Sequence, residues 1–241
     1  MTVRTLLVGE DVDDFALLRL RESYGGVVTL GKNPRLPSAV AAHADMQLLC
    51  VGDTYVIAEN LAESAPAAYR LLCRSGKRVI LSEAPLSERY PCDCILNAKP
   101  LGKRLLCRVA STDEAVKRLC AKTGIELLNV KQGYAACSTL VFKYAAVTAD
   151  RGIASALSEI GFDVLKLESG GIRLDGYDYG FIGGASFFDP VQNTVFFFGT
   201  PERGMSGLLE EFLKRHSTGC RFLSETPLYD CGGAVIIDTE E

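Results

Sequence analysis

The feature that most restricts the fold is a unit that recurs five times: an amphipathic helix, a glycine and then a short apolar strand. The first unit has a predicted helix over Asp14 to Ser23, then Gly25 and Gly26, then a strand over Val27 to Leu30. A glycine in this place lets the helix end in the left-handed conformation. The other helices, glycines and strands are Ala62 to Arg74, Gly76 and Val79 to Leu81; Asp113 to Lys122 (capped by Thr112), Gly124 and Ile125 to Leu128; Arg151 to Ile160, Gly161 and Phe162 to Leu167; and Ser206 to His216, Gly219 and Cys220 to Leu223.

The spacing of the units predicts a repeat architecture. Gly26, Gly76, Gly124, Gly161 and Gly219 are separated by 50, 48, 37 and 58 residues. Periods of this length are typical of stacked or radial arrays of supersecondary units. The last unit is expected to continue into the first, which would close the array.

Further strands complete each unit. A strand is predicted before every helix, and another apolar run precedes several of these, so the unit reads strand, strand, helix, strand. Five such units fill residues 1–241 without a linker or a low-complexity segment, which predicts a single α/β domain. The strands before the helices are Arg4 to Val8, Leu48 to Val51, Leu105 to Val109, Ala145 to Thr148 and Val195 to Phe198; the additional runs include Thr139 to Phe142 and Gly180 to Phe188.

A doubly wound nucleotide-binding sheet is the competing architecture. Thr5 to Gly9 resembles its first strand and turn. The glycine-rich phosphate-binding fingerprint does not follow, because Glu10 and Asp11 come next.

Composition narrows the possible partners and the cellular compartment. The net charge is −4 and the basic residues are scattered, so no footprint for nucleic acid or an anionic membrane is expected. There are nine cysteines, an odd number, and no signal peptide or membrane-spanning run, which predicts free thiols in the cytoplasm. Cys92 and Cys94 form the one close pair, with no second pair or nearby histidine, so no metal and no cofactor are expected.

The segment from Gly133 to Phe142 carries the first candidate for chemistry. Thr139 to Phe142 is β-branched and aromatic, as in a buried strand, and Gly133 indicates a tight turn before it. Cys137 lies between them, where a side chain can be directed into a cavity. A buried cysteine is usually an inert small hydrophobe, so its partners decide its role.

The order of several short motifs resembles that of the pentein, or guanidino-group-modifying, enzymes. Residues 43–147 resemble the C-terminal half of dimethylarginine dimethylaminohydrolases and, more distantly, arginine deiminases. The motifs are His43-Ala44-Asp45-Met46, Asp93 to Asn97, Leu105 to Arg108, and Gly133-x-x-x-Cys137-Ser138. Gln132 to Ser138 and Gly180 to Gly184 also identify the chain as a member of an uncharacterised bacterial family of this fold.

The resemblance implies a fold and a chemistry. The fold is a propeller of five strand–strand–helix–strand units around a pseudo-fivefold axis. In the known enzymes the reactive cysteine lies near the C-terminus, so this chain resembles a circular permutation of them. The implied activity is that of a cysteine-dependent hydrolase or amidinotransferase acting on a small guanidino or amidino compound; the alternative is a non-catalytic protein that binds a small cation or acts as a scaffold.

Such chemistry needs a nucleophile, a proton shuttle and carboxylates. Cys137 is the candidate nucleophile, His43 the general acid and base, and Asp45 a carboxylate that holds the cation. In an extended segment, the His-x-Asp spacing puts both side chains on one face. Asp178, Asp150 and Tyr134 are the candidate substrate contacts, although Asp150 could equally cap a helix.

Alternative roles and one departure from the enzyme pattern accompany these assignments. Gly183 and Gly184 occupy the region where an acidic substrate-binding pair is expected, and glycine cannot pair with a guanidinium. His43 could be a partly exposed residue, and Asp45 could cap a turn. His216 and Cys231 are weaker candidates, the first because it closes a predicted helix and the second because it resembles Cys137 only in preceding glycines.

Overall fold

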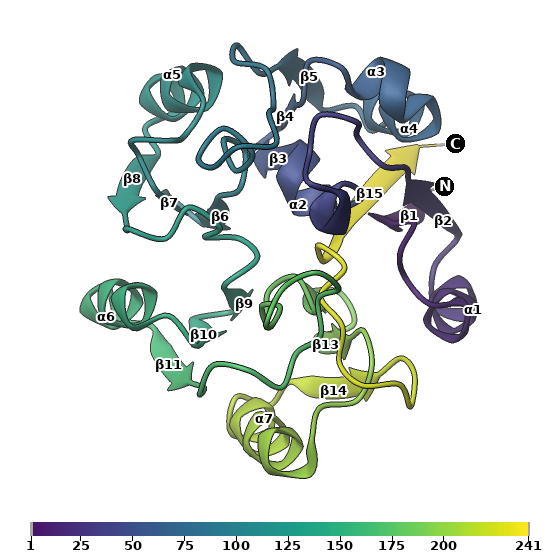
Figure 1. The fold of residues 1–241 in the computed structure, drawn as a ribbon, viewed down its shortest axis with the longest axis vertical. Helices are drawn as coiled ribbons and strands as arrows, with labels where there is room; N and C mark the ends of the chain where they lie inside the picture. Colours follow the sequence, from purple (N-terminus) through teal and green to yellow (C-terminus); the bar gives the residue numbers. More distant parts are fainter. Residues whose placement is uncertain (1, 241) are drawn as a thin grey trace.

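The computed structural model describes residues 2–240, and over these residues the chain forms five three-stranded sheets arranged in a ring (Figure 1). In each sheet the central strand is antiparallel to one neighbour and parallel to the other. The sheets are β15-β1-β2, β3-β4-β5, β6-β7-β8, β9-β10-β11 and β12-β13-β14. The repeat that the sequence predicts is therefore confirmed as a propeller of five α/β units.

The elements follow one another in a regular order. The strands are β1 (Thr2–Gly9), β2 (Gly26–Leu30), β3 (Leu48–Val51), β4 (Thr54–Ile57), β5 (Arg78–Leu81), β6 (Lys99–Leu101), β7 (Arg104–Cys107), β8 (Glu126–Asn129), β9 (Leu140–Phe142), β10 (Ala145–Thr148), β11 (Asp163–Lys166), β12 (Ser186–Asp189), β13 (Thr194–Phe197), β14 (Gly219–Phe222) and β15 (Ala234–Glu240). The helices are α1 (Asp14–Ser23), the 3-10 helix η1 (Ser38–Val40), α2 (Ala44–Gln47), α3 (Leu61–Ser64), α4 (Pro66–Arg74), α5 (Glu114–Thr123), α6 (Arg151–Glu159) and α7 (Arg203–Arg215).

Aspartates cap three of the crossover helices, and left-handed glycines follow α4, α5 and α6. The predicted glycine ends are wrong for α1 and α7, because α1 ends at the extended Tyr24 and Ser217, not Gly219, takes the positive φ after α7. Asp13 accepts hydrogen bonds from the backbone of α1, Asp113 from that of α5 and Asp150 from that of α6. Asp113, rather than the predicted Thr112, is the capping residue of α5. At the other end of α5, Gly124 has a φ of 69°, the left-handed conformation that glycine adopts without a steric penalty.

The two ends of the chain share one sheet. β15 runs antiparallel to β1 from the pair Thr2 and Glu240 to the pair Val8 and Ala234. The first unit therefore takes its outer strand from the C-terminus, which is the closure that the sequence predicts. The C-terminal strand lies beside the N-terminal one in Figure 1.

Three predicted boundaries are wrong for physical reasons. The predicted helix Ala62 to Arg74 is divided into α3 and α4, because Pro66 has no N–H to continue the first helix and instead begins the second. The strand immediately before α4 is β4, whereas Leu48–Val51 is its antiparallel partner. Within Gly180 to Phe188, only the residues from Ser186 onward are in a strand.

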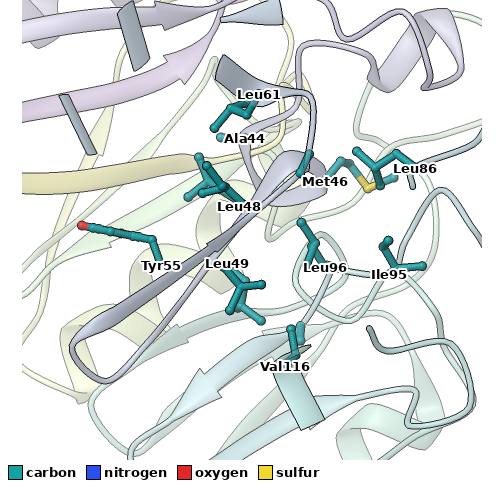
Figure 2. Packing of buried hydrophobic residues seen from close by; sticks show 14 of the residues in the cluster. Ala44, Met46, Leu48, Leu49, Tyr55, Leu61, Leu86, Ile95, Leu96 and Val116 are labelled. Atoms are coloured by element: carbon teal, nitrogen blue, oxygen red, sulfur yellow. The ribbon is translucent and has the colours of Figure 1, made fainter. Parts of the chain in front are cut away.

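A buried apolar cluster anchors the short helix α2 to the second and third units. Figure 2 shows Met46 of α2 beside Leu86, and Leu49 of β3 on the side of Leu96 and Val116, all within one buried cluster. Met46 is fully buried. This packing fixes the position of the residues at the start of α2. Among the helices of residues 2–240, none has both the length and the apolar character needed to cross a membrane.

Ring closure predicts a large effect for a single core residue of β15. Ile237 is fully buried and pairs with Thr5 of β1. Replacing Ile237 by alanine should lower the free energy of unfolding by about 2–5 kcal/mol, because the site cannot fully collapse. Urea denaturation measures this change, with Thr239→Ala on the same strand as the control. Equal free energies of unfolding for the two variants would contradict a stabilising role for Ile237 in the pairing of β1 with β15.

Candidate active site

A small cavity collects residues from four separate segments of the ring. Its volume is about 260 Å³. The segments are the approach to α2, the loop before β9, the loop between β11 and β12, and the loop before β15. The lining residues are Val40, His43, Met46, Tyr134, Cys137, Leu174, Tyr177, Asp178, Tyr179, Phe181 and Asp230.

His43, Asp45 and Cys137 meet in one place. One imidazole nitrogen, one carboxylate oxygen and the sulfur all lie within 4.8 Å of one another. His43 is the residue immediately before α2, with φ −64° and ψ 124°, and Asp45 lies in the first turn of that helix. The prediction of an extended segment here is wrong, because a helical turn, and not strand alternation, brings the two side chains together.

Asn97 fixes the cysteine loop against α2. Its side-chain nitrogen donates hydrogen bonds to the sulfur of Cys137 at 3.0 Å and to the backbone oxygen of Asp45 at 3.1 Å. Its side-chain oxygen accepts from the backbone nitrogens of Ala136 and Cys137 at 2.8 and 3.2 Å. Asn97 ends the motif Asp93 to Asn97, but the sequence predicts no role for it, because nothing nearby in the chain indicates a partner forty residues away.

Asp230 is a second buried carboxyl group that sequence reasoning missed. Its Oδ1 lies 3.7 Å from Nδ1 of His43, and both side chains are 1% exposed. Its two oxygens accept hydrogen bonds from the backbone nitrogens of Phe181 (2.8 Å) and Gly232 (3.2 Å). The one signal in the sequence is that Asp230 directly precedes the glycine-rich segment Cys231-Gly232-Gly233.

The glycines that depart from the enzyme pattern make room for this carboxyl group. A Cβ atom on Gly184 would overlap the carboxylate of Asp230, and one on Gly183 would overlap backbone oxygens of the cysteine loop. Gly232, at φ +79°, packs against His43 in the same way. Asp230 therefore lies directly against the segment in which the resemblance implies an acidic pair.

Burial shifts the pKa values of several groups in the site. Desolvation raises the pKa of Asp45 to about 6 and also raises the pKa of Asp230, with the nearby His43 opposing both shifts. Desolvation, reinforced by the charges of Asp45 and Asp230, raises the pKa of Cys137 well above its usual value. Desolvation also lowers the pKa of Lys99, a further neighbour of Asp45 and Cys137 that sequence reasoning missed.

Several polar atoms of the site have no internal partner. Within residues 2–240, neither ring nitrogen of His43 nor Oδ1 of Asp45 makes a hydrogen bond. Buried polar atoms are nearly always paired, so these atoms are available to a ligand with N–H donors. The nitrogen, oxygen and sulfur of His43, Asp45 and Cys137 could also hold a metal ion such as zinc, a site that the sequence did not indicate.

Of the three predicted substrate contacts, two line the small cavity and one lies elsewhere. Tyr134 lines the cavity and its hydroxyl donates to Asp93 at 2.5 Å, while Asp178 lines the cavity from an exposed position. Asp150 lines a separate cavity of about 760 Å³ and caps α6.

The two weaker candidates do not line the small cavity. His216 forms an ion pair with Asp163 at 2.9 Å. Cys231 is fully buried beside Asp230, with its sulfur directed at the backbone oxygen of Gly184.

Structural comparison assigns the class. Crystal structures of a dimethylarginine dimethylaminohydrolase adduct with 4-chloro-2-hydroxymethylpyridine and of inosamine-phosphate amidinotransferase StrB1 from Streptomyces griseus share this fold. The first aligns with a TM-score of 0.57 at 12% identity, over 92% of this chain and 93% of the other. The second aligns with a TM-score of 0.55 at 13% identity, over 99% and 94%. The chain has the pentein fold of guanidino-group-modifying enzymes.

The sequence family is narrower. The profile described as a family of unknown function (DUF6873) matches residues 7–235, so the chain belongs to that family. No curated protein matches the sequence. The circular permutation inferred from the position of Cys137 stays a prediction.

The packing of Asp230 predicts opposite effects for two glycine substitutions. Gly184→Ala should displace Asp230 and lower the free energy of unfolding by about 1–3 kcal/mol, as overpacking does. Gly207→Ala is the matched control: nothing lies within 4 Å of its added methyl group on α7, so it should be neutral or stabilise by about 0.5–1 kcal/mol. Thermal and urea denaturation measure both, and an unperturbed Gly184→Ala would contradict the packing role.

Proposed function

We propose that this protein is a cysteine-dependent enzyme that acts on a guanidino or amidino group through a covalent intermediate on Cys137. The observation that carries the proposal is that Cys137, His43 and Asp230 line one small cavity, with Asp45 within 4.8 Å of His43 and Cys137. A thiol, an imidazole and two carboxyl groups are the groups that such chemistry requires. The activities of the proteins that share the fold are consistent with it.

Asp230, which is buried, and Asp45, which is half-buried, are suited to hold the planar cation. Carboxylates pair well with the N–H fork of a guanidinium. The raised pKa values of Asp45 and Asp230 reflect anions that are buried with little compensation, which a cation would supply. Asp45 lies beside the sulfur of Cys137, so a guanidinium held there has its central carbon near the nucleophile.

The reaction then proceeds in two displacements. His43 accepts the proton of the Cys137 thiol, and the thiolate attacks the guanidino carbon, forming a C–S bond. The C–N bond to the leaving amine breaks as His43 passes that proton to the amine nitrogen. In the second half, His43 takes a proton from water, which attacks the same carbon, and returns the proton to the sulfur as the C–S bond breaks. An amine in place of water gives amidine transfer.

Substrate binding also prepares the nucleophile. Cys137 is protonated in the ligand-free site, because it is buried beside two acidic groups. A bound cation favours the nearby thiolate and lowers the pKa of Cys137. The nucleophile is thus formed when the substrate is present.

A protein that only binds a small cation is the second candidate. The raised pKa of Cys137 favours it, because a protonated thiol is a poor nucleophile. The two functions share the carboxyl pair and differ only in what Cys137 does after binding.

Removal of the sulfur separates the two functions. Cys137→Ala should reduce turnover of a guanidino substrate at least about 1,000-fold, as loss of a nucleophile does, while binding persists. Cys73→Ala is the control, because Cys73 is an exposed cysteine on α4. Release of urea or ammonia and trapping of a thiouronium adduct by mass spectrometry measure the reaction. Full activity of Cys137→Ala would refute the proposed nucleophile.

The pKa of Asp45 predicts the pH dependence of binding. The group is ionised above a pKa of about 6, and only the ionised form attracts the cation. The dissociation constant of a guanidinium ligand should therefore rise as pH falls below 6, by about tenfold per pH unit for one proton. Calorimetry on Cys137→Ala measures it without turnover. Asp45→Asn should bind weakly with a flatter profile; an unchanged profile would assign the titration to another group.

A further inference from the structure

The side chains that line the cavity restrict the part of the substrate beyond its guanidinium or amidinium group (the tail). This step rests on the proposed function, which places that group (the head) beside Asp45 and Asp230. Among residues 2–240, the lining residues include no lysine and no arginine. Apart from His43, its ionisable side chains are Asp178, Asp230, Cys137 and three tyrosines (Tyr134, Tyr177 and Tyr179). A ligand that carries a carboxylate would therefore meet no lysine or arginine on this wall.

Three basic residues lie near the cavity without lining it. One is Lys99, the neighbour of Asp45 and Cys137, whose pKa is lowered by desolvation. Arg108 donates to the hydroxyl of Tyr90 at 2.6 Å and stacks on that ring, which in turn contacts the ring of the lining residue Tyr134. Arg173, next to the lining residue Leu174, pairs with Asp175 at 3.1 Å. A substrate carboxylate would therefore be desolvated beside acidic groups, which is costly for binding.

An aromatic wall replaces the missing cation. The rings of Tyr134 and Phe181 stack with centroids 6.2 Å apart at 30°, and Tyr179 meets Phe181 edge-on at 6.1 Å. Tyr177 adds a fourth ring to the lining and is 52% exposed. Flat apolar surfaces of this kind pack well against aliphatic or aromatic groups.

The size of the cavity adds a limit. Its volume of about 260 Å³ is below the range of about 300–1,000 Å³ that is typical of pockets for drug-sized ligands. A guanidinium head with a short tail fits this space better than a large conjugate.

We infer that the substrate is a small monocationic guanidine or amidine whose tail is apolar or aromatic and carries no carboxylate. The buried acidic pair selects the head, and the aromatic wall selects the tail. This inference rests on the proposed function for the position of the head, and it excludes free amino acids such as arginine as good substrates.

A matched pair of ligands tests the tail. Butylguanidine and 4-guanidinobutanoate have the same head and chain length and differ in a terminal methyl or carboxylate group. Binding of each to the full-length Cys137→Ala protein is measured by calorimetry at pH 7.5, with 2-phenylethylguanidine and arginine alongside. We expect butylguanidine and 2-phenylethylguanidine to bind at least about tenfold more tightly than the two carboxylates, a difference of about 1.4 kcal/mol.

A charge introduced into the wall should change the preference. Tyr177→Lys supplies the missing cation at an exposed position, so it should strengthen binding of 4-guanidinobutanoate and weaken that of butylguanidine. Tyr144→Lys is the control, because Tyr144 is 80% exposed and does not line the cavity, and it should leave the ratio unchanged.

The outcomes separate this inference from the proposed function. Equal or tighter binding of the carboxylates by Cys137→Ala, or an unchanged ratio in Tyr177→Lys, overturns the inference alone. The predicted preference without any turnover by the wild type supports the inference and sinks the proposed catalysis. If none of the four guanidines binds, both fail.

Discussion

The antiparallel ladder between β1 and β15 holds the ring closed, and the candidate site depends on the same ladder. Asp230 and Gly232 lie just before β15. The pairing of Ala234 with Val8 therefore restricts the positions that these two residues can take. At the end of β1, a Cβ on Gly9 would overlap the backbone of Ala42 and meet that of Cys231. The segment that leads to His43 and the segment that carries Asp230 are thus packed on either side of one glycine. The strand pairing that closes the ring therefore also brings together the segments that carry His43 and Asp230.

Close packing explains why small residues surround the acidic groups. Gly183, Gly184 and Gly232 each lie where a methyl group would overlap the cysteine loop, Asp230 or His43. A carboxyl group enclosed in this way has little water, so its charge is poorly compensated and its pKa rises. The backbone nitrogens of Phe181 and Gly232 offset part of that cost and hold the oxygens in place. The glycines around Asp230 therefore allow the close packing that excludes water from its carboxyl group and raises its pKa.

The sequence predicted well what depends on local periodicity and poorly what depends on contacts between units. Helix and strand patterns with a glycine every fifty residues or so were sufficient for five units, since each unit is a local structure. His43, Asp45 and Cys137 were found because they lie in short motifs whose order resembles that of the pentein enzymes and because their side chains suit this chemistry. Asn97 and Asp230 were missed because their importance comes from neighbours 40 and more than 180 residues away. The division of the predicted helix at Pro66 is a different kind of error. The proline was a local signal for a helix boundary, but the helical pattern around it favoured one continuous helix.

The protonation of the free site follows from the same arrangement and bears on how a reactive thiol can be kept inert. Cys137 lies between Asn97, which can donate to a thiolate, and two carboxyl groups that disfavour one. Burial and the two acidic groups prevail, and the sulfur keeps its proton. In the proposed function, a cation in the cavity offsets the charges of the two carboxylates, so it favours the thiolate together with the Asn97 hydrogen bond and against the desolvation of the sulfur. Reactivity then depends on the charge of what is bound, so the features that select the ligand also protect the thiol when no ligand is present.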